Sequence, residues 1–380
     1  MTDSANHLFS PLTLRGITLP NRIAVSPMCE YSSVDGLPND WHLVHLGSRA
    51  IGGAGLVITE AAAVSPEGRI TPADLGIWND EQIAPLQRIT AFLHEHGAYA
   101  GIQLAHAGRK ASMAVPWAAV QEAVGEGEGG WTNVLAPSPV RFADNYPLPQ
   151  AVDTTAIRGV VRAFGTAAAR ALQAGFDVAE IHAAHGYLLH QFLSPRSNQR
   201  TDEYGGSFEN RTRLLLEVVR AVRGVWPENL PVFVRISATE WAAEGSGPSW
   251  DAEQSVALAR LLRAEGVDLV DVSTGGNLHG AKIPVGPGFQ VPFAERVRRE
   301  AQVPTAAVGL ITEPEQADAI VRSGEADLVL LARELLRDPY WPTHAAQALG
   351  QAISWPVQYE RAASGKVPHR EPIAPHSKQG

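Results

Sequence analysis

The chain has 380 residues and a formal charge of −9 at pH 7; 45% of its residues are hydrophobic and 19% are charged. These proportions are those of an ordinary globular protein with a large core, and they exclude disorder as the main state. The negative balance, without a cluster of Lys and Arg, argues against a surface that binds nucleic acid independently of sequence.

The N-terminal stretch MTDSANHLFSPL lacks a basic segment followed by an apolar one, and the sequence has no run of about 18 apolar residues. We therefore expect a cytoplasmic protein that does not enter a membrane. Cys29 is the single cysteine, which excludes an intramolecular disulfide and an iron–sulfur cluster with its usual four thiolates. Redox chemistry would therefore need a bound organic cofactor or this one thiol.

Apolar runs rich in β-branched residues recur along the whole chain, and each is typical of a buried strand. Between them, apolar residues repeat at intervals of three and four, which predicts amphipathic helices at 80–97, 156–175 and 253–266. Several helices end at a glycine that is followed at once by a strand, as in RAEGVDLVDV. The predicted strands are 22–28, 55–64, 99–108, 177–186, 231–239, 268–276, 304–311 and 327–335.

About eight strand–helix units in strict alternation predict a parallel sheet, and eight strands close into a barrel. The predicted fold class is therefore α/β, a single (β/α)8 TIM barrel, which routinely occupies a chain of this length. An open doubly wound sheet is the alternative. No G-x-G-x-x-G follows the first predicted strand, however, so the dinucleotide-binding fingerprint is absent.

Two segments do not fit the alternation. The stretch 110–155 contains GEGEGG and several prolines and has little periodicity; we interpret it as an excursion over the barrel mouth after the third strand. The stretch 362–380 is rich in Pro, His and small polar residues, which predicts a loosely ordered C-terminal tail. The barrel domain is accordingly expected to span 1–361.

Active sites of such barrels lie at the C-terminal ends of the strands, whereas polar residues elsewhere usually serve stability. Polar residues at those ends are therefore the candidates for function. They are Cys29, Gln103, His106, His182, His185, Arg235 and Arg333.

His182 and His185 follow the run VAEI, and two imidazoles at one strand end can converge on a single ligand. They suit a pair of hydrogen-bond donors to a carbonyl or phenolate oxygen, a metal half-site, or structural histidines with satisfied hydrogen bonds. A catalytic zinc site usually adds a third His or a carboxylate, and no HxH or HExxH pattern supplies one. The metal reading is therefore disfavoured.

Arg235 ends the run PVFVR and would place a permanent cation in a buried mouth, which requires an anionic partner. That partner is either the N1–C2=O region of a flavin ring, which gains negative charge on reduction, or a strand carboxylate such as Glu180. Gln103 offers a donor and an acceptor, which suit the uracil-like edge of a flavin or a hydrogen bond within the barrel.

The last two predicted strands end in AVGLI and LLARELLRDP. Barrels commonly bind phosphate there with backbone N–H groups near a glycine and the start of a helix. Gly309 allows close approach of the backbone, and Arg333 can form two parallel hydrogen bonds with phosphate oxygens. The pattern predicts a phosphate site without identifying the cofactor that carries it.

Taken together, these segments closely resemble the old yellow enzyme family, and within it the bacterial thermophilic-like ene-reductases and xenobiotic reductases. The similarity runs from near residue 8 to about 361 and includes PNRIAVSPMCEYSS, TEAAAVSPEGRI, IQLAHAGRKA, AVGLIT and ARELLRDPYW. Its most specific part is HAAHGY followed by SPRSNQRTDEYGGS.

The resemblance implies a tightly bound, non-covalent flavin mononucleotide (FMN), NADPH or NADH as a transient hydride donor, and no metal. His182 and His185 would bind the electron-withdrawing oxygen of the substrate, Tyr187 would donate a proton, and Tyr31 would hydrogen-bond substrate. The thiol of Cys29 would tune the flavin potential. The residues that would contact FMN are Ser26, Pro27, Met28, Cys29, Ala61, Gln103, Arg235, Gly309, Ala332 and Arg333.

The implied activity is reduction of the activated C=C bond of α,β-unsaturated carbonyl and related compounds. Hydride would pass from NAD(P)H to flavin N5 and then to the β-carbon of the substrate, and Tyr187 would protonate the α-carbon. Both partners would use one site in turn, which predicts ping-pong kinetics. The alternatives are a barrel aldolase or hydrolase that uses the His182–His185 pair, and a non-enzymatic flavin-storage or sensor protein.

Three features depart from the family pattern. Ala332 stands where glycine usually precedes the phosphate-binding arginine, and the segment 112–134 is longer than in the shortest relatives. Arg361 matches an arginine that reaches into the neighbouring active site in close relatives, but Ala362 and Ala363 replace the usual terminal Gly-Trp. A homodimer or a dimer of dimers is expected, with Arg361 at the neighbouring site. The sequence does not specify the physiological substrate.

Overall fold

The computed structural model describes residues 6–363, 365 and 367–374. Eight parallel strands close into a barrel whose order around the axis follows the order along the chain. The predicted TIM barrel is therefore confirmed. Its strands are β3 (Ile23–Val25), β4 (Leu56–Ala63), β5 (Tyr99–Ala105), β8 (Val178–Ala183), β9 (Val232–Ser237), β10 (Leu269–Ser273), β11 (Thr305–Ala307) and β12 (Leu328–Leu331).

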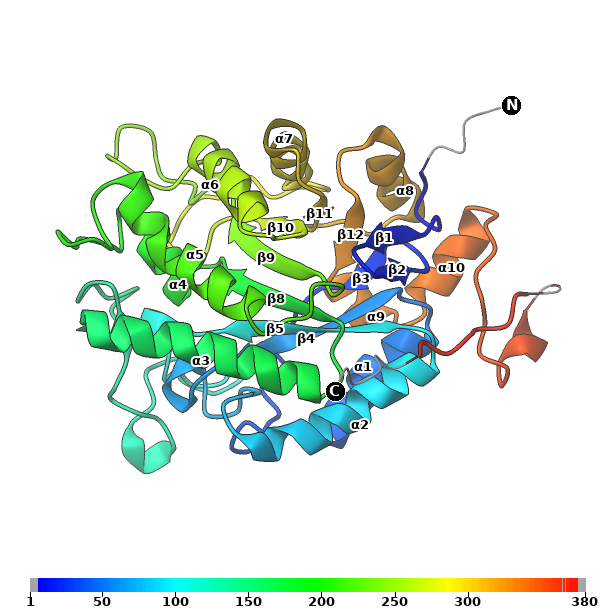
Figure 1. Ribbon diagram of the computed structural model, residues 1–380, viewed down its shortest axis with the longest axis horizontal. Coiled ribbons are helices and arrows are strands. Elements are labelled where there is room, and N and C mark those ends of the chain that lie inside the picture. Colours follow the sequence, from blue (N-terminus) through cyan, green and yellow to red (C-terminus); the bar gives the residue numbers. More distant parts are fainter. Residues whose placement is uncertain (1–5, 364, 366, 375–380) are drawn as a thin grey trace.

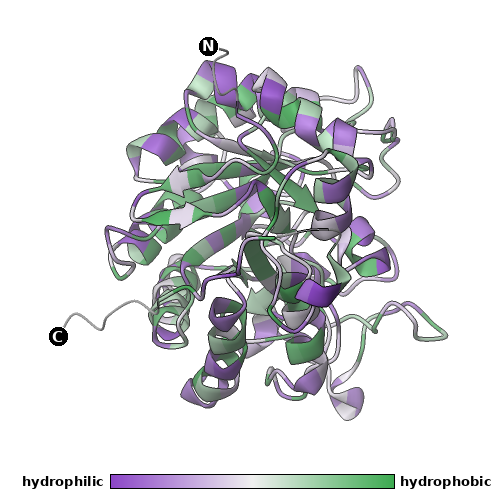
Figure 2. Ribbon diagram, turned by 90° about the vertical axis from the view of Figure 1, so that its right-hand side faces the viewer, coloured by the Kyte–Doolittle hydropathy of each residue, from purple (hydrophilic) through white to green (hydrophobic). Residues whose placement is uncertain are grey.

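Helices follow the strands and lie outside the barrel (Figure 1). In Figure 2 the strands at the centre are mainly hydrophobic, whereas the helices carry hydrophilic residues on their outer faces. No helix of the described residues is long and apolar enough to cross a membrane. The helices are α1 (Asp40–Ile51), α2 (Ile83–Glu95), α3 (Thr154–Gln173), α4 (Leu188–Leu193), α5 (Phe208–Arg223), α6 (Ala252–Ala264), α7 (Val291–Ala301), α8 (Pro314–Ser323), α9 (Arg333–Arg337) and α10 (Trp341–Ala348).

Side-chain caps fix the starts of the longer helices. Asp153 accepts a hydrogen bond from Ala156 N at the start of α3, and Asp251 accepts one from Gln254 N at the start of α6. Each cap satisfies a backbone N–H that has no partner inside its helix, and such a cap contributes about 1 kcal/mol. The caps set where each helix leaves the loop at the top of the barrel.

A hairpin of β1 (Leu12–Leu14) and β2 (Ile17–Leu19) covers the N-terminal end of the barrel. Its turn reaches residues that immediately precede barrel strands: Gly16 N donates to Asn229 O at 2.8 Å, and Arg15 Nε pairs with Asp268 Oδ1 at 2.5 Å. Because the hairpin closes this end, the opposite end is left for a ligand.

The excursion predicted after the third barrel strand is confirmed. Residues 106–153 separate β5 from α3 and contain only short elements: β6 (Leu135–Ala136), β7 (Gln150–Ala151) and the 3₁₀ turns η3 (Gly108–Lys110) and η4 (Glu126–Glu128). Part of the excursion forms a small apolar cluster with Tyr187, which lies beyond the end of β8. The excursion therefore lies against the C-terminal end of the barrel.

Every predicted strand was longer than the observed one, and two of them show why. The run 327–335 leaves strand geometry after Leu331, and Arg333 is the first residue of α9. The run 177–186 ends as a strand at Ala183, because His185 and Gly186 have φ of +58° and +73°. A continuous apolar run does not mark the residue at which a strand turns into a helix.

The predicted loose tail lies partly outside the described residues, which lack 364, 366 and 375–380. Within the described part, Arg370 Nη1 donates to Ala50 O at 2.6 Å and to Ile51 O at 2.9 Å, at the end of α1. Ile373 N donates to His94 O at 2.9 Å. The loose order of the remainder of the tail stays a prediction.

Candidate active site at the C-terminal end of the barrel

Two histidines and a tyrosine meet beyond the end of β8. The ring centroids of His182 and His185 are 5.2 Å apart, and those of His182 and Tyr187 are 5.0 Å apart, both in edge-to-face orientation. His185 Nε2 lies 2.7 Å from Ser273 Oγ at the end of β10, and His185 N donates to Ser237 Oγ of β9 at 2.9 Å. The structure thus brings the predicted pair together and anchors one of its members to two neighbouring strands.

Both imidazoles are held neutral. Burial lowers the pKa of His182 and of His185 well below the ordinary value, and the nearby Arg235 guanidinium lowers them further. His182 lies directly opposite Arg235 in the register of β8 and β9. A neutral imidazole has one N–H donor, so each histidine can donate one hydrogen bond to a shared oxygen.

Several buried polar atoms at this end lack a hydrogen-bond partner among the described residues, and His182 Nδ1 and Ser26 Oγ are two of them. Ser26 follows β3, and its backbone N–H already donates to Leu331 O at 3.0 Å. Leaving such groups unpaired costs about 1–3 kcal/mol each. Their position suits a polar ligand that lies across the barrel mouth.

The tyrosines and the cysteine are protonated. Burial raises the pKa of Tyr187 and of Cys29 well above their ordinary values, and Asp74 adds to both effects. Tyr31, which has φ of +46° and contacts the edge of Trp117, has its phenol pKa raised by burial and by Cys29. At neutral pH the cysteine is a thiol, which is a poor nucleophile, and both phenols retain their protons.

The interior of the barrel contains a buried polar group of four residues. Arg235 Nε pairs with Asp271 Oδ2 at 2.9 Å, so the internal partner of Arg235 is Asp271 of the next strand and not Glu180. Gln103 Nε2 donates instead to Glu180 Oε1 at 2.8 Å. A register shift in β4 between Ile58 and Ala61 places Ala61 opposite Gln103, a kind of irregularity that often re-aims side chains beside active sites.

Glu180 gives this group a pH dependence. Burial, with Asp271 nearby, raises the pKa of its carboxyl to about 8. A carboxyl whose pKa is raised by folding stabilises the folded state fully when the pH is below its pKa in the unfolded chain, about 4.3. This contribution is lost as the pH rises toward the pKa in the folded protein. Glu180→Gln keeps an acceptor for Gln103 and removes the titration.

The unfolding temperature of Glu180→Gln minus that of the wild type is therefore expected to be larger at about pH 8 than at about pH 5. Thermal unfolding of both proteins at the two pH values measures this change. An unchanged difference between them would show that Glu180 is ionised in the folded protein throughout.

A cavity of about 250 Å³ opens at the ends of β10, β11 and β12. Ser273, the partner of His185, lines it together with Gly309, Ala332 and Arg333. The Arg333 side chain is exposed, and no hydrogen bond or ion pair engages its guanidinium within residues 6–363, 365 and 367–374. The residues predicted to bind phosphate therefore lie close to the histidine pair, because Ser273 both lines this cavity and contacts His185.

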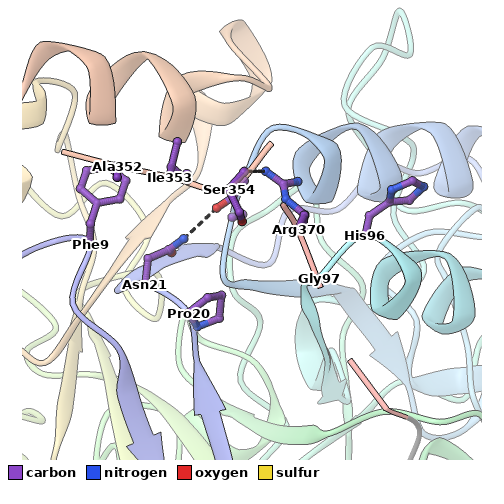
Figure 3. Close-up of a pocket in the computed structure, with 11 residues that line it drawn as sticks. Phe9, Pro20, Asn21, His96, Gly97, Ala352, Ile353, Ser354 and Arg370 are labelled. Atoms are coloured by element: carbon purple, nitrogen blue, oxygen red, sulfur yellow. Dashed lines mark hydrogen bonds between the residues drawn. The ribbon is translucent and has the colours of Figure 1, made fainter. Parts of the chain in front are cut away.

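A second cavity, of about 80 Å³, lies at the N-terminal end of the barrel (Figure 3). Asn21, Gly53 and Gly97, each shortly before a barrel strand, line it with Arg370. Two of its polar side chains are already paired: Asn21 Nδ2 donates to Gly53 O at 2.8 Å, and Arg370 Nη2 donates to Ser354 O at 2.5 Å. This end of a barrel usually serves stability, and none of the predicted site residues lies here.

Some predicted residues remain apart from this group, and some contacting residues were missed. Arg361 is exposed in the turn η5 (Glu360–Ala362), so its role at a neighbouring subunit stays a prediction. Sequence reasoning missed Ser273 and Lys110. Ser273 lies near the end of the predicted strand 268–276, so its position at a strand end could have identified it. Lys110 lies in the excursion, where no periodicity distinguishes it.

The chain is similar to several known proteins. The NADH:flavin oxidoreductase / NADH oxidase family model matches residues 7–351. An NADPH dehydrogenase of Geobacillus sp. (strain WCH70) is 50% identical over 356 residues, which are 93% of this chain and 98% of that protein. Morphinone reductase, solved in complex with tetrahydroNAD, is 30% identical with a TM-score of 0.74, and 92% of each chain is covered.

The barrel alone is shared with 2-naphthoyl-CoA reductase, solved with 2-naphthoyl-CoA. That structure is 23% identical with a TM-score of 0.80, and the match covers 91% of this chain and 52% of the other. The chain thus spans about half of that protein's length.

Proposed function

Because the chain belongs to the NADH:flavin oxidoreductase / NADH oxidase family, we propose that it is an FMN-dependent ene-reductase that reduces the activated C=C bond of α,β-unsaturated carbonyl compounds. It is an enzyme of the NADPH dehydrogenase, old yellow enzyme type, because 50% and 51% of its residues are identical to those of two such enzymes over 93% of its length. We place it in the thermophilic-like and xenobiotic reductase subgroup on its sequence motifs.

One observation carries the proposal: two neutral imidazoles and a protonated phenol converge at the barrel mouth. Two N–H donors aimed at one oxygen stabilise the negative charge that develops there when an adjacent double bond accepts hydride. A buried phenol that keeps its proton at neutral pH can then release it to carbon. An aldolase or hydrolase would need a nucleophile or metal-bound water, which this group does not offer.

The residues at the mouth fit FMN. Arg333 and the backbone near Gly309 and Ala332 would hold its phosphate, and Ser26, Pro27, Met28, Cys29 and Ala61 would line its ring, with Gln103 and Arg235 at the polar edge. The unpaired Ser26 Oγ and the cavity beside Arg333 support this arrangement. When bound, FMN would accept hydride from NAD(P)H and supply it to the substrate.

The residues of the chain supply orientation and the proton. His182 and His185 hold the carbonyl oxygen of the substrate and draw electron density from the β-carbon, and Tyr31 completes the binding of that oxygen. Tyr187 gives its hydroxyl proton to the α-carbon. The excursion beside Tyr187 restricts water at this point, which strengthens each of these electrostatic contacts.

We further propose a homodimer or a dimer of dimers in which Arg361 reaches the neighbouring active site. Its exposure in η5 leaves the guanidinium free for such a contact. The stoichiometry is tested by light scattering of the purified protein.

The activity is tested by anaerobic titration of the purified protein with NADPH and then with 2-cyclohexenone. We expect a yellow protein whose absorbance near 450 nm bleaches with NADPH and returns with the enone. A colourless protein would exclude a flavin enzyme, and a yellow protein that NADPH does not bleach would favour flavin storage or sensing. Repeating the titration with NADH determines the preferred donor.

A further inference from the structure

Lys110 joins two loops that carry the site residues. It ends the turn η3 after β5, and its Nζ donates to His185 O and to Gly276 O, each at 2.9 Å. One carbonyl belongs to the turn between β8 and α4, and the other to the loop after β10. Within residues 6–363, 365 and 367–374, no carboxylate forms an ion pair with this ammonium.

The two loops pack backbone against backbone, which explains why they converge on one lysine. A Cβ atom added to Gly186 would lie 2.3 Å from Gly276 O, and one added to Gly276 would lie 2.5 Å from His185 Cα. Only glycine allows this approach. His185 itself has φ of +58°, so the turn is held in an uncommon conformation, and Lys110 binds the carbonyl of that residue.

The same ammonium lies against two aromatic rings. Its Nζ is 5.2 Å from the ring centroid of Tyr187 and 4.3 Å from that of Phe142. A cation within about 6 Å of a ring is attracted to it, and more strongly where water is restricted. Lys110 is therefore the positive charge that lies beside the proton donor.

Resting on the proposed function, we propose that Lys110 is a positioning residue for proton transfer from Tyr187. It holds the turn that precedes the tyrosine, and its charge stabilises the tyrosinate that forms when the hydroxyl proton moves to the substrate α-carbon. The O–H bond breaks, a C–H bond forms at carbon, and solvent water later returns a proton to the phenolate oxygen. No further oxidant or reductant takes part.

The charges that surround this ammonium favour such a role. Burial and then Arg109 lower the pKa of Lys110 to about 7, and burial lowers the pKa of each nearby imidazole. The neighbouring histidines are therefore neutral, and a tyrosinate at Tyr187 would place a negative charge beside the ammonium. The titratable groups that face it are Arg109, His182, His185, His190 and Tyr187.

The test compares Lys110→Met with Lys110→Arg in the flavin-loaded enzyme, at about pH 6 where the ammonium is charged. We expect Lys110→Met to slow reoxidation of the reduced enzyme by 2-cyclohexenone about tenfold, the size of effect that a cation beside a ring provides. The rates of reduction by NADPH and of reoxidation by ferricyanide are expected to stay unchanged, because neither reaction transfers a proton to carbon. Lys110→Arg should recover most of the rate, and the exposed Lys282→Met is the matched control.

A second comparison separates this role from a merely structural one. In a Tyr187→Phe background, Lys110→Met should cause no further loss of enone reduction, because no tyrosinate can form there for its charge to stabilise. Independent losses in the double variant, or equal slowing with ferricyanide, would overturn the proposal. If the wild type does not reduce 2-cyclohexenone at all, the proposed function fails instead, before any variant is compared.

Discussion

Tyr187→Phe is expected to lower the rate of 2-cyclohexenone reduction by about 10²- to 10⁴-fold, the usual contribution of a positioned general acid. The phenol is buried, keeps its proton at neutral pH and lies edge-to-face with His182. Phenylalanine preserves the ring, its packing and the contact with Lys110, and it removes only the hydroxyl group that carries the proton. The measurement is stopped-flow reoxidation of the reduced enzyme by the enone.

Flavin content and the rate of reduction by NADPH provide the internal control, since neither requires a proton from Tyr187. Both are expected to match the wild type. If Tyr187→Phe reduces the enone at the wild-type rate, another group or solvent supplies the proton, and Tyr187 serves only to pack the mouth.

His182→Phe is expected to lower the same reoxidation rate by about 10²- to 10³-fold, the usual effect of removing one donor to a developing oxyanion. The buried His182 Nδ1 has no partner among the described residues, so its removal breaks no hydrogen bond within this part of the chain. Because burial and Arg235 hold the pKa of both histidines far below 7, the donors are neutral at working pH. We therefore expect no rise in the rate between about pH 6 and pH 8 of the kind that deprotonation of a charged histidine would cause.

His344→Phe is the matched control, because this exposed histidine lies on α10 and pairs with Asp338. It should reduce the enone at the wild-type rate. A His182→Phe enzyme with normal enone activity, or a wild-type rate that follows a histidine titration near pH 6.5, would contradict the role of a neutral donor pair.

The fold was predictable because its signals are local and repeated. Alternating apolar runs and amphipathic stretches identified the barrel, and low periodicity identified the excursion after β5. The ends of strands were less predictable. Nothing in the run LLAREL marks where the strand ends at Leu331 and α9 begins at Arg333, because the apolar pattern resumes within the helix at the buried Leu335.

The site was predictable where position in the barrel selects a residue. The histidine pair and Arg333 lie at strand ends, and the structure places them around the mouth. Contacts between loops were not predictable. Lys110 contacts His185 and Gly276, which lie 75 and 166 positions away in the chain. No periodic pattern in the sequence predicts a contact over such a separation. The sequence suggested a strand carboxylate as the internal partner of Arg235 and gave Glu180 as the example; the register of β9 and β10 sets Asp271 opposite it instead.

The central claim is that a flavin lies across the barrel mouth with both imidazoles donating to one substrate oxygen. A crystal structure of the FMN-loaded enzyme with a bound carbonyl compound tests it most directly. We predict the carbonyl oxygen within hydrogen-bond distance, about 2.6–3.2 Å, of one nitrogen of His182 and one of His185, with the FMN phosphate beside Arg333. A flavin bound elsewhere, or a carbonyl that contacts neither histidine, would contradict the account.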